Sequence, residues 1–147
     1  MRRAERGLGA VAAIALLVLL ASAAAALLRL GQSSQAALAQ DLQGERASLA
    51  ARAGIDWGLY QALKGSWTTC AGASQTLDLV ADTGMRVTVS CSSSSFNEGE
   101  SVPGTPQVLR VYTLDAVACN ASAACPDAAA ATGAVYVERR RQVQATN

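Results

Sequence analysis

The sequence contains no histidine, only one lysine and only one phenylalanine among its 147 residues. Histidine is the commonest general base at neutral pH and the commonest metal ligand, so its absence argues against most acid–base and metal-dependent enzymes. The formal net charge is +1, and no basic stripe alternates with aromatic residues as in proteins that follow a phosphate backbone. We therefore expect a non-enzymatic protein that needs no cofactor and binds no nucleic acid.

Charge is also absent from a long stretch near the N-terminus. Residues 8–28 include no charged side chain, and a helix of that length spans roughly 31 Å, which is enough to cross a bilayer. Arg2, Arg3 and Arg6 precede this stretch, and positive charge before a span favours a cytoplasmic N-terminus. The sequence predicts a single-pass membrane protein whose residues after 28 lie on the far side of the membrane.

The cysteines all lie after the apolar stretch: Cys70, Cys91, Cys119 and Cys125. An even number in a small exported domain usually forms disulfides, which indicates an oxidising compartment such as a bacterial periplasm. The short spacing of the last two favours a local bond, and the first two would then tie a helix-to-sheet connection to a strand. Four cysteines nevertheless permit three connectivities. A zinc site is disfavoured because the cysteines lack the paired close spacing of zinc sites and no histidine is present.

A second helical pattern continues beyond the span, through residues 32–64. Its apolar row has spacings of mostly three and four and consists of Leu38, Leu42, Leu49, Ala53, Trp57, Tyr60 and Lys64, joined by Ile55, Leu59 and Leu63. We expect the rest of the chain to cover this row, in preference to a coiled-coil partner. Gly54 and Gly58 each cost a helix about 1 kcal/mol relative to alanine, which suggests close approach by the sheet or by a neighbouring subunit.

The remaining residues alternate as β-strands do. Residues 76–80 and 85–92 predict a hairpin, and residues 107–119 and 134–144 predict two further strands. Residues 92–106 are rich in serine, glycine and proline and predict a long surface loop, a candidate contact region. We interpret Glu98 and Glu100 there as solvated, in preference to paired catalytic carboxylates or calcium ligands.

These elements indicate the α+β class, with about four antiparallel strands packed on one long helix. Arg139, Arg140 and Arg141 partly alternate across the last strand. Arginines in this position protect a sheet edge against aggregation, although they also suit an anionic lipid or an acidic partner.

The N-terminal residues resemble a type IV prepilin leader, in which a few basic residues and a glycine precede an uninterrupted apolar helix. The matching residues are Arg6, Gly7 and Leu8. The resemblance implies cleavage after Gly7 by a prepilin peptidase and N-methylation of Leu8. It also implies a cytoplasmic leader at 1–7, a transmembrane helix at 8–28, an amphipathic helix at 29–64 and a β domain with disulfides at 65–147.

One residue departs from the pattern of major pilins. Those proteins place a glutamate at the fifth mature position to pair with a neighbour's terminal amine, whereas this chain has Ala12. A carboxylate in hydrocarbon is costly unless it is paired, so its absence removes a docking interaction that a repeating subunit needs. The hypothesis is a non-repeating role, at a filament tip or in initiation.

A conventional secretory signal is the alternative interpretation of the N-terminus. Ala21, Ser22 and Ala23 fit a small-residue cleavage site, which would release a secreted binding domain. The apolar run continues through Leu28 without proline or glycine, however, and a retained span accounts for more of the residues.

The run from Ala51 to Leu63, with Gly54, Asp56, Trp57 and Gly58, resembles the signature of the MSHA biogenesis protein MshP family. The likeness extends to Val87–Cys91, Ala118–Asn120, Cys125-Pro126 and Tyr136–Arg139. It implies a pilin-like fold in the bacterial inner membrane and a role in a type IV pilus used for surface attachment. The implied partners are other pilin-like subunits, inner-membrane assembly proteins and the prepilin peptidase. A pseudopilin of a type II secretion system is a related alternative.

Overall fold

The structure is a computed structural model that describes residues 5–147; for residues 5–8, 30, 32–34 and 36 it describes the backbone alone. The chain divides into two compact units, which meet between Ala39 and Gln40. The first unit, as far as it is described, is helical. The second contains the end of the same helix and a sheet, and each unit is considered by itself below.

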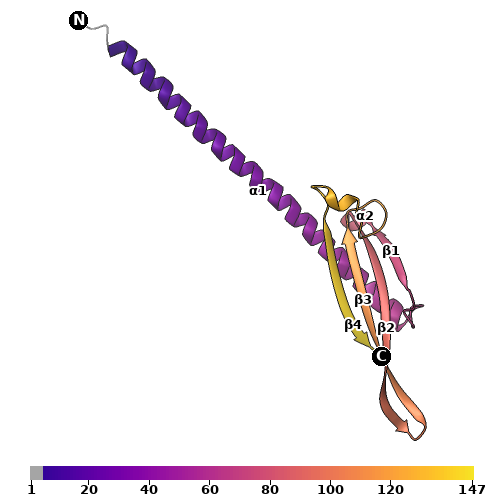
Figure 1. Cartoon of the computed structure of the whole chain (residues 1–147). Helices are drawn as coiled ribbons and strands as arrows, with labels where there is room; N and C mark the ends of the chain where they lie inside the picture. The colour runs from indigo at the N-terminus through magenta and orange to yellow at the C-terminus, as the bar shows by residue number, and fades with distance from the viewer. Residues whose placement is uncertain (1–4) are drawn as a thin grey trace. The chain divides into compact units, whose positions relative to one another are not determined.

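Helix α1 runs from Glu5 to Leu63 (Figure 1). Alanine and leucine, both strong helix formers, dominate its sequence, and no proline occurs before position 103. The helix ends where the Tyr60 carbonyl accepts hydrogen bonds from the backbone N–H groups of both Lys64, at 2.8 Å, and Gly65, at 2.9 Å. The Gln61 side chain then accepts the Ser66 N–H at 3.2 Å. These bonds satisfy groups that a helix terminus leaves without intrahelical partners.

Four antiparallel strands form one sheet in the order β1-β2-β3-β4 (Figure 1). Their bounds are β1 Ser74–Leu79, β2 Met85–Val102, β3 Thr105–Cys119 and β4 Glu138–Thr146. The short helix α2, Val80–Thr83, connects β1 to β2 and ends at Gly84, whose φ of 76° is left-handed. The 3-10 helix η1, Ala130–Thr132, lies between β3 and β4. The α+β class and the four antiparallel strands are confirmed.

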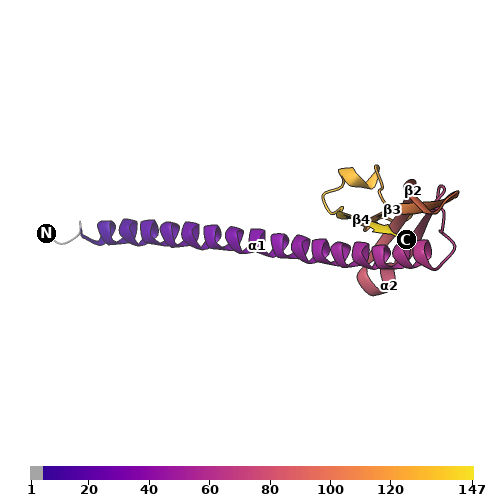
Figure 2. The ribbon, with the colours of Figure 1, turned by 90° about the horizontal axis from the view of Figure 1, so that it is seen from below.

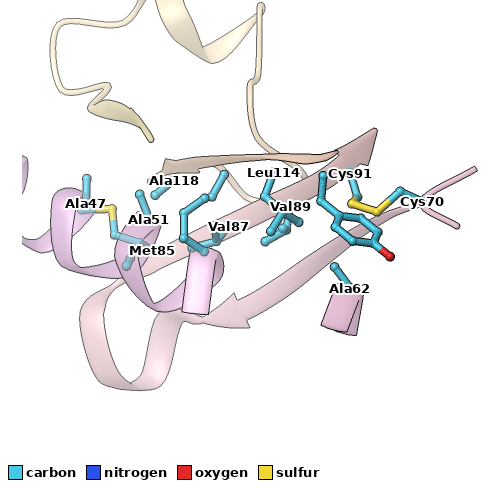
Figure 3. Packing of buried hydrophobic residues seen from close by; sticks show 14 residues of the cluster. Ala47, Ala51, Ala62, Cys70, Met85, Val87, Val89, Cys91, Leu114 and Ala118 are labelled. Atoms are coloured by element: carbon cyan, nitrogen blue, oxygen red, sulfur yellow. A yellow bond between two sulfur atoms is a disulfide. The ribbon is translucent and has the colours of Figure 1, made fainter. Parts of the chain in front are cut away.

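One face of the sheet packs on α1 and forms the core. Alternate residues of β2 and β3 supply it: Met85, Val87, Val89, Cys91, Tyr112, Leu114, Ala116 and Ala118, all of them buried. Figure 3 shows several of them directed toward Ala47 and Ala51 of the helix. Burying each large side chain contributes about 1.5–3 kcal/mol. The intervening residues Thr88, Ser90, Thr113 and Asp115 belong to the other, polar face.

The segment between β3 and β4 lies on that other side of the sheet (Figure 2). A second small cluster forms there from Val117, Cys119, Ala121 and Cys125, with Tyr136 packed against it. Asn120 holds the two ends of the segment together, because its amide donates to the Val135 carbonyl and accepts the Val137 N–H, at 2.8 and 3.0 Å. Burial, helped by the hydrogen bond to Glu138, raises the pKa of Tyr136 above its ordinary value.

Residues 92–106 are not a loop, and that prediction was wrong. They continue β2 and β3 as a hairpin, paired from Ser92 with Thr113 to Val102 with Thr105, with irregularities beside Glu100. Pairing between the strands satisfies the backbone groups whatever the side chains are, so a polar sequence remains extended. Gly99 and Gly104 supply the left-handed φ angles, 112° and 87°, that the bulge and the turn require. The last strand also begins at Glu138, later than the predicted residue 134.

The disulfides join Cys70 to Cys91 and Cys119 to Cys125, with Cα atoms 5.1 and 5.7 Å apart. These are the pairs that the sequence favours. The first attaches the connection after α1 to the middle of β2. Nearby, the Thr68 carbonyl accepts a hydrogen bond from the Tyr112 hydroxyl at 3.0 Å, and the Thr69 carbonyl accepts one from Ser93 at 2.7 Å.

Because the two bonds close loops of different length, they differ in their predicted contribution to stability. Chain entropy gives about 3.3 kcal/mol for a separation of 21 residues and about 2.2 kcal/mol for one of 6. Urea unfolding of the full chain, followed by tryptophan fluorescence, should therefore show a larger loss for Cys70→Ala with Cys91→Ala than for Cys119→Ala with Cys125→Ala. All four side chains are buried, so the two double variants are matched. The opposite order would contradict this account.

Candidate functional site

The first candidate region is the apolar stretch of α1. Gly9–Arg29 has a mean hydropathy of 2.7 and is long and apolar enough, by length and composition, to cross a membrane. Its side chains are exposed, including that of Ala12. Gly7 lies within α1, whereas residues 1–4 of the leader and the side chains of Arg6 and Leu8 lie outside the described residues.

The second region is the face of α1 that contacts the sheet. Its central row consists of small residues, spaced by three or four: Gly44, Ala47, Ala51, Gly54, Gly58 and Ala62. Ala47 and Ala51 are fully buried and Ala62 is 1% exposed. We call this row the small-residue face. Ile55 and Leu59 flank it and contact the core, as predicted.

The two central glycines mark where the helix backbone lies closest to the strands. A Cβ atom at Gly54 would lie 2.6 Å from Val87 Cγ1, and one at Gly58 would lie 2.9 Å from Val89 Cγ1. Real Cβ atoms essentially never approach other atoms so closely. The sheet, and not a neighbouring subunit, is therefore what approaches these glycines. Because a side chain there would displace β2, this geometry explains why glycine is tolerated in mid-helix.

The two other residues of the signature have different surroundings. The Trp57 ring packs edge-to-face on Trp67, with centroids 5.0 Å apart and planes at 87°. This contact holds the connection after α1 against the helix, since such pairs contribute about 0.5–1.5 kcal/mol. Asp56 is exposed. Gly54, Trp57 and Gly58 thus serve packing, whereas Asp56 remains available at the surface.

The predicted core row of the helix was wrong for most of its large residues. Leu38, Leu42, Leu49 and Tyr60 are 62%, 63%, 61% and 62% exposed, and Leu63 is 41% exposed. The small-residue face has the same helical period and lies on the other side. It faces inward because small residues allow the helix to approach the sheet closely, and the valines and leucines of the strands then fill the interior.

An apolar row therefore lies on the outer surface of the second unit. We define the outward stripe as Leu42, Leu49, Ala53 and Tyr60, whose separations of seven, four and seven keep them on one side of the helix. Within residues 40–147, no element packs over it. A row of exposed large apolar side chains is typical of a surface that contacts other proteins or lipid.

A groove of about 520 Å³ lies between α1 and the edge strand β4. It is lined by Arg52, Ile55, Asp56, Leu59, Arg140, Arg141, Gln142 and Val143. Arg140 forms an ion pair with Asp115, N to O 2.6 Å, which raises the pKa of Arg140. Arg141 donates to the Ser48 hydroxyl at 2.8 Å. Among the described residues no carboxylate forms an ion pair with Arg52 or Arg141, so the groove keeps an excess of positive charge.

Asp78 lies outside the groove, and its partners lie at the turn between β1 and β2. The Val80 N–H, assisted by Arg86, lowers the pKa of Asp78 at the turn between β1 and β2. Within residues 5–147, no three His, Cys, Asp or Glu side chains gather as a metal site would require.

Comparison with known proteins identifies no relative: no family model, no curated protein and no solved structure matches this chain. The class is accordingly defined by the fold alone, an N-terminal apolar helix followed by a four-stranded antiparallel sheet. This arrangement is consistent with a pilin-like fold.

The close contact between the small-residue face and the sheet leads us to expect that a larger side chain at Gly54 lowers the stability of the protein. Gly54→Leu gains helix propensity worth about 1 kcal/mol, but a side chain against Val87 and Val89 must displace β2, and overpacking costs about 1–3 kcal/mol or more. We expect a net loss of stability, seen as a lower urea midpoint of the full chain in detergent. Ala53→Leu is the matched control, because Ala53 is the adjacent residue and is exposed. Equal midpoints for the two variants would refute the close approach.

Proposed function

We propose that this chain is a non-enzymatic, membrane-anchored subunit of the type IV pilin-like kind. It acts as a minor pilin or as an assembly and initiation factor of an MSHA-type pilus used for surface attachment. The N-terminus lies in the cytoplasm of a bacterium, the apolar stretch in the inner membrane, and the sheet in the periplasm or, after assembly, in the pilus. The observation that carries this proposal is that α1 has apolar side chains on its surface both before and after the division between the units.

The two apolar surfaces suit assembly through helix packing. The stretch Gly9–Arg29 is suited to hydrocarbon, in which helices associate through packing of side chains. The outward stripe would continue contacts with other helices outside the membrane. A soluble domain with no partner would gain nothing from leaving Leu42, Leu49 and Tyr60 in water, since burying each such side chain is worth about 1.5–3 kcal/mol.

The continuity of α1 favours a retained anchor over a secreted domain cleaved near Ala23. The helix passes through Ala21–Ala23 without a break, and the Ser22 hydroxyl donates to the Leu19 carbonyl at 2.8 Å, as within a regular helix. The alternative role as a pseudopilin of a type II secretion system rests on the same surfaces. It differs only in the partners, which would be the other pseudopilins and the secretion machinery.

Ala12 supports a role with few copies. It is an exposed methyl group in the stretch that would lie in the membrane, and it offers no carboxylate to a neighbour's terminal amine. This chain therefore lacks the carboxylate of the charged pair that fixes successive subunits of a repeating filament. A place at a tip, or in initiation, needs fewer such contacts.

N-terminal processing tests the anchor. In cells that contain a prepilin peptidase, we expect the mature chain to begin at Leu8 and to carry one additional methyl group, found by N-terminal sequencing and intact mass. In cells without the peptidase the leader should remain. A chain that begins near Ala24 in both strains would make it an ordinary secreted domain.

Charge placed on the outward stripe tests assembly separately from folding. Leu49→Asp should change the free energy of unfolding by no more than about 0.5 kcal/mol, because the side chain already lies in water. It should nevertheless abolish co-purification of the protein with other pilin-like subunits and its presence in pili sheared from the cells. Val135→Asp is the matched control at a position 81% exposed outside the stripe. If the Leu49 variant were recovered normally in both measurements, the outward stripe would have no role in assembly.

A further inference from the structure

The hairpin formed by β2 and β3 extends beyond the rest of the sheet (Figure 1). Pairing of β1 with β2 ends where Ser74 meets Ser90, and pairing of β4 with β3 begins where Val111 meets Thr146. We define the arm as residues 96–109, which in the sheet pair only with each other. Within the described residues, no strand covers either edge of the arm. A two-stranded ribbon of this kind is marginally stable in water and gains from a partner.

The arm carries an unusual combination of side chains for a solvated hairpin. Phe96, the single phenylalanine of the chain, is 54% exposed, and Val102 and Val108 are 61% and 58% exposed. Glu98 and Glu100 are its only charged residues, and no basic residue occurs between Arg86 and Arg110. Glu100 accepts the Gly104 N–H at 2.9 Å and so supports the turn. Glu98 therefore contributes an exposed negative charge to a ribbon whose other residues, Glu100 apart, are uncharged.

The groove between α1 and β4 has the complementary combination. Its apolar part comes from Ile55, Leu59 and Val143, and its charged part from Arg52 and Arg141, against one acid within it, Asp56. Arg140 also lines the groove, but its guanidinium is paired with Asp115 of the other sheet face. The charges left to attract an outside carboxylate are those of Arg52 and Arg141. Groove and arm thus match in both polarity and charge.

An arm cannot reach the groove of its own chain. Groove residue Val143 pairs with Leu114 of β3, and β3 begins directly after the arm's turn, at Thr105. Nine residues of strand, roughly 30 Å at the usual rise, separate the groove from the tip of the arm, and Phe96, which pairs with Leu109, is roughly 17 Å away along the strand. Any contact between an arm and a groove therefore joins two molecules that are displaced along the strand direction.

We propose that the arm of one copy docks into the groove of a second copy, with Glu98 beside Arg52 and the apolar side chains of the arm against Ile55, Leu59 and Val143. The contact is heterologous, because it joins two different surfaces. One such contact needs two copies only and leaves one arm and one groove free for other subunits. The inference goes beyond the proposed function, since a domain with another role could associate in this way.

Photo-crosslinking of the full chain in membranes tests the contact directly. We would place p-benzoylphenylalanine at Phe96, co-express two copies with different tags, and map the adduct by mass spectrometry. The expected product joins residue 96 of one copy to residues 52–59 or 140–143 of the other. An adduct that maps elsewhere on the second copy, an adduct only with other proteins, or no adduct would overturn the proposal.

Charge reversal supplies the second readout. Glu98→Arg alone and Arg52→Glu alone should each lower the adduct yield by about five-fold or more, since each replaces attraction by repulsion. A mixture of one copy with Glu98→Arg and one with Arg52→Glu should restore the adduct between the two different copies. Asp82→Arg and Arg46→Glu are the matched controls, because both residues are exposed and lie outside the arm and the groove. Failure of the mixture to restore the adduct would contradict the pairing of Glu98 with Arg52.

Two further measurements distinguish the absence of this contact from misfolding of a variant and from failure of the proposed function. Formation of both disulfides, seen by intact mass without reductant, shows whether a charge variant has folded. N-terminal processing at Gly7 is measured on the same samples. A chain processed as a prepilin but without the residue 96 adduct would refute the contact and leave the proposed function standing, and the reverse result would refute only the proposed function.

Discussion

The close approach of the α1 backbone to β2 and β3 determines the organisation of the second unit. Because Gly54 and Gly58 have no side chain, Val87, Val89 and Leu114 lie directly against the helix backbone. The strands, not the helix, then supply most of the volume of the core. Leu42, Leu49 and Tyr60 of the helix are left on its other side, so the apolar surface that this domain presents to its surroundings is a consequence of how its interior is packed.

The periodicity of the helix could not say which of its faces is buried. The row from Leu42 to Tyr60, with separations of seven and four, and the row from Gly44 to Ala62, with separations of three and four, both fit the helical period. The usual rule, that large apolar residues lie inside, selects the wrong one. The two glycines were the better signal, because a residue that costs a helix about 1 kcal/mol is tolerated where a backbone must come close. The helix and the four strands were predictable because they depend on local pattern, whereas the spacing of the cysteines favoured the observed disulfide pairs but left three connectivities open.

The arm and the groove were hidden from the sequence for different reasons. The arm has water on both of its faces, so its residues lack the alternation by which a strand is recognised, and Gly99 and Pro103 resemble the residues of a loop. The groove is formed by Arg52 and Arg141, which are far apart in the chain and meet only when α1 packs beside β4. Arg141 was expected to protect a sheet edge, and it does lie on the edge strand. Its contact with Ser48 of the helix depends on tertiary packing that no local pattern reports.

The residues that stabilise this domain are largely distinct from those that it offers to other molecules. The core, the two disulfides and the contact of Trp57 with Trp67 are complete within one chain, so folding does not wait for a partner. The outward stripe, the arm and the groove are exposed, and one molecule cannot satisfy them: the stripe lies on the side of α1 away from the sheet, and the arm ends roughly 30 Å from the groove. A protein that folded to function alone would gain by replacing Leu49, Tyr60 and Phe96 with polar residues, at little cost to its interior. Their presence at the surface is explained if folding comes first and the uncovered surfaces then find their partners in an assembly.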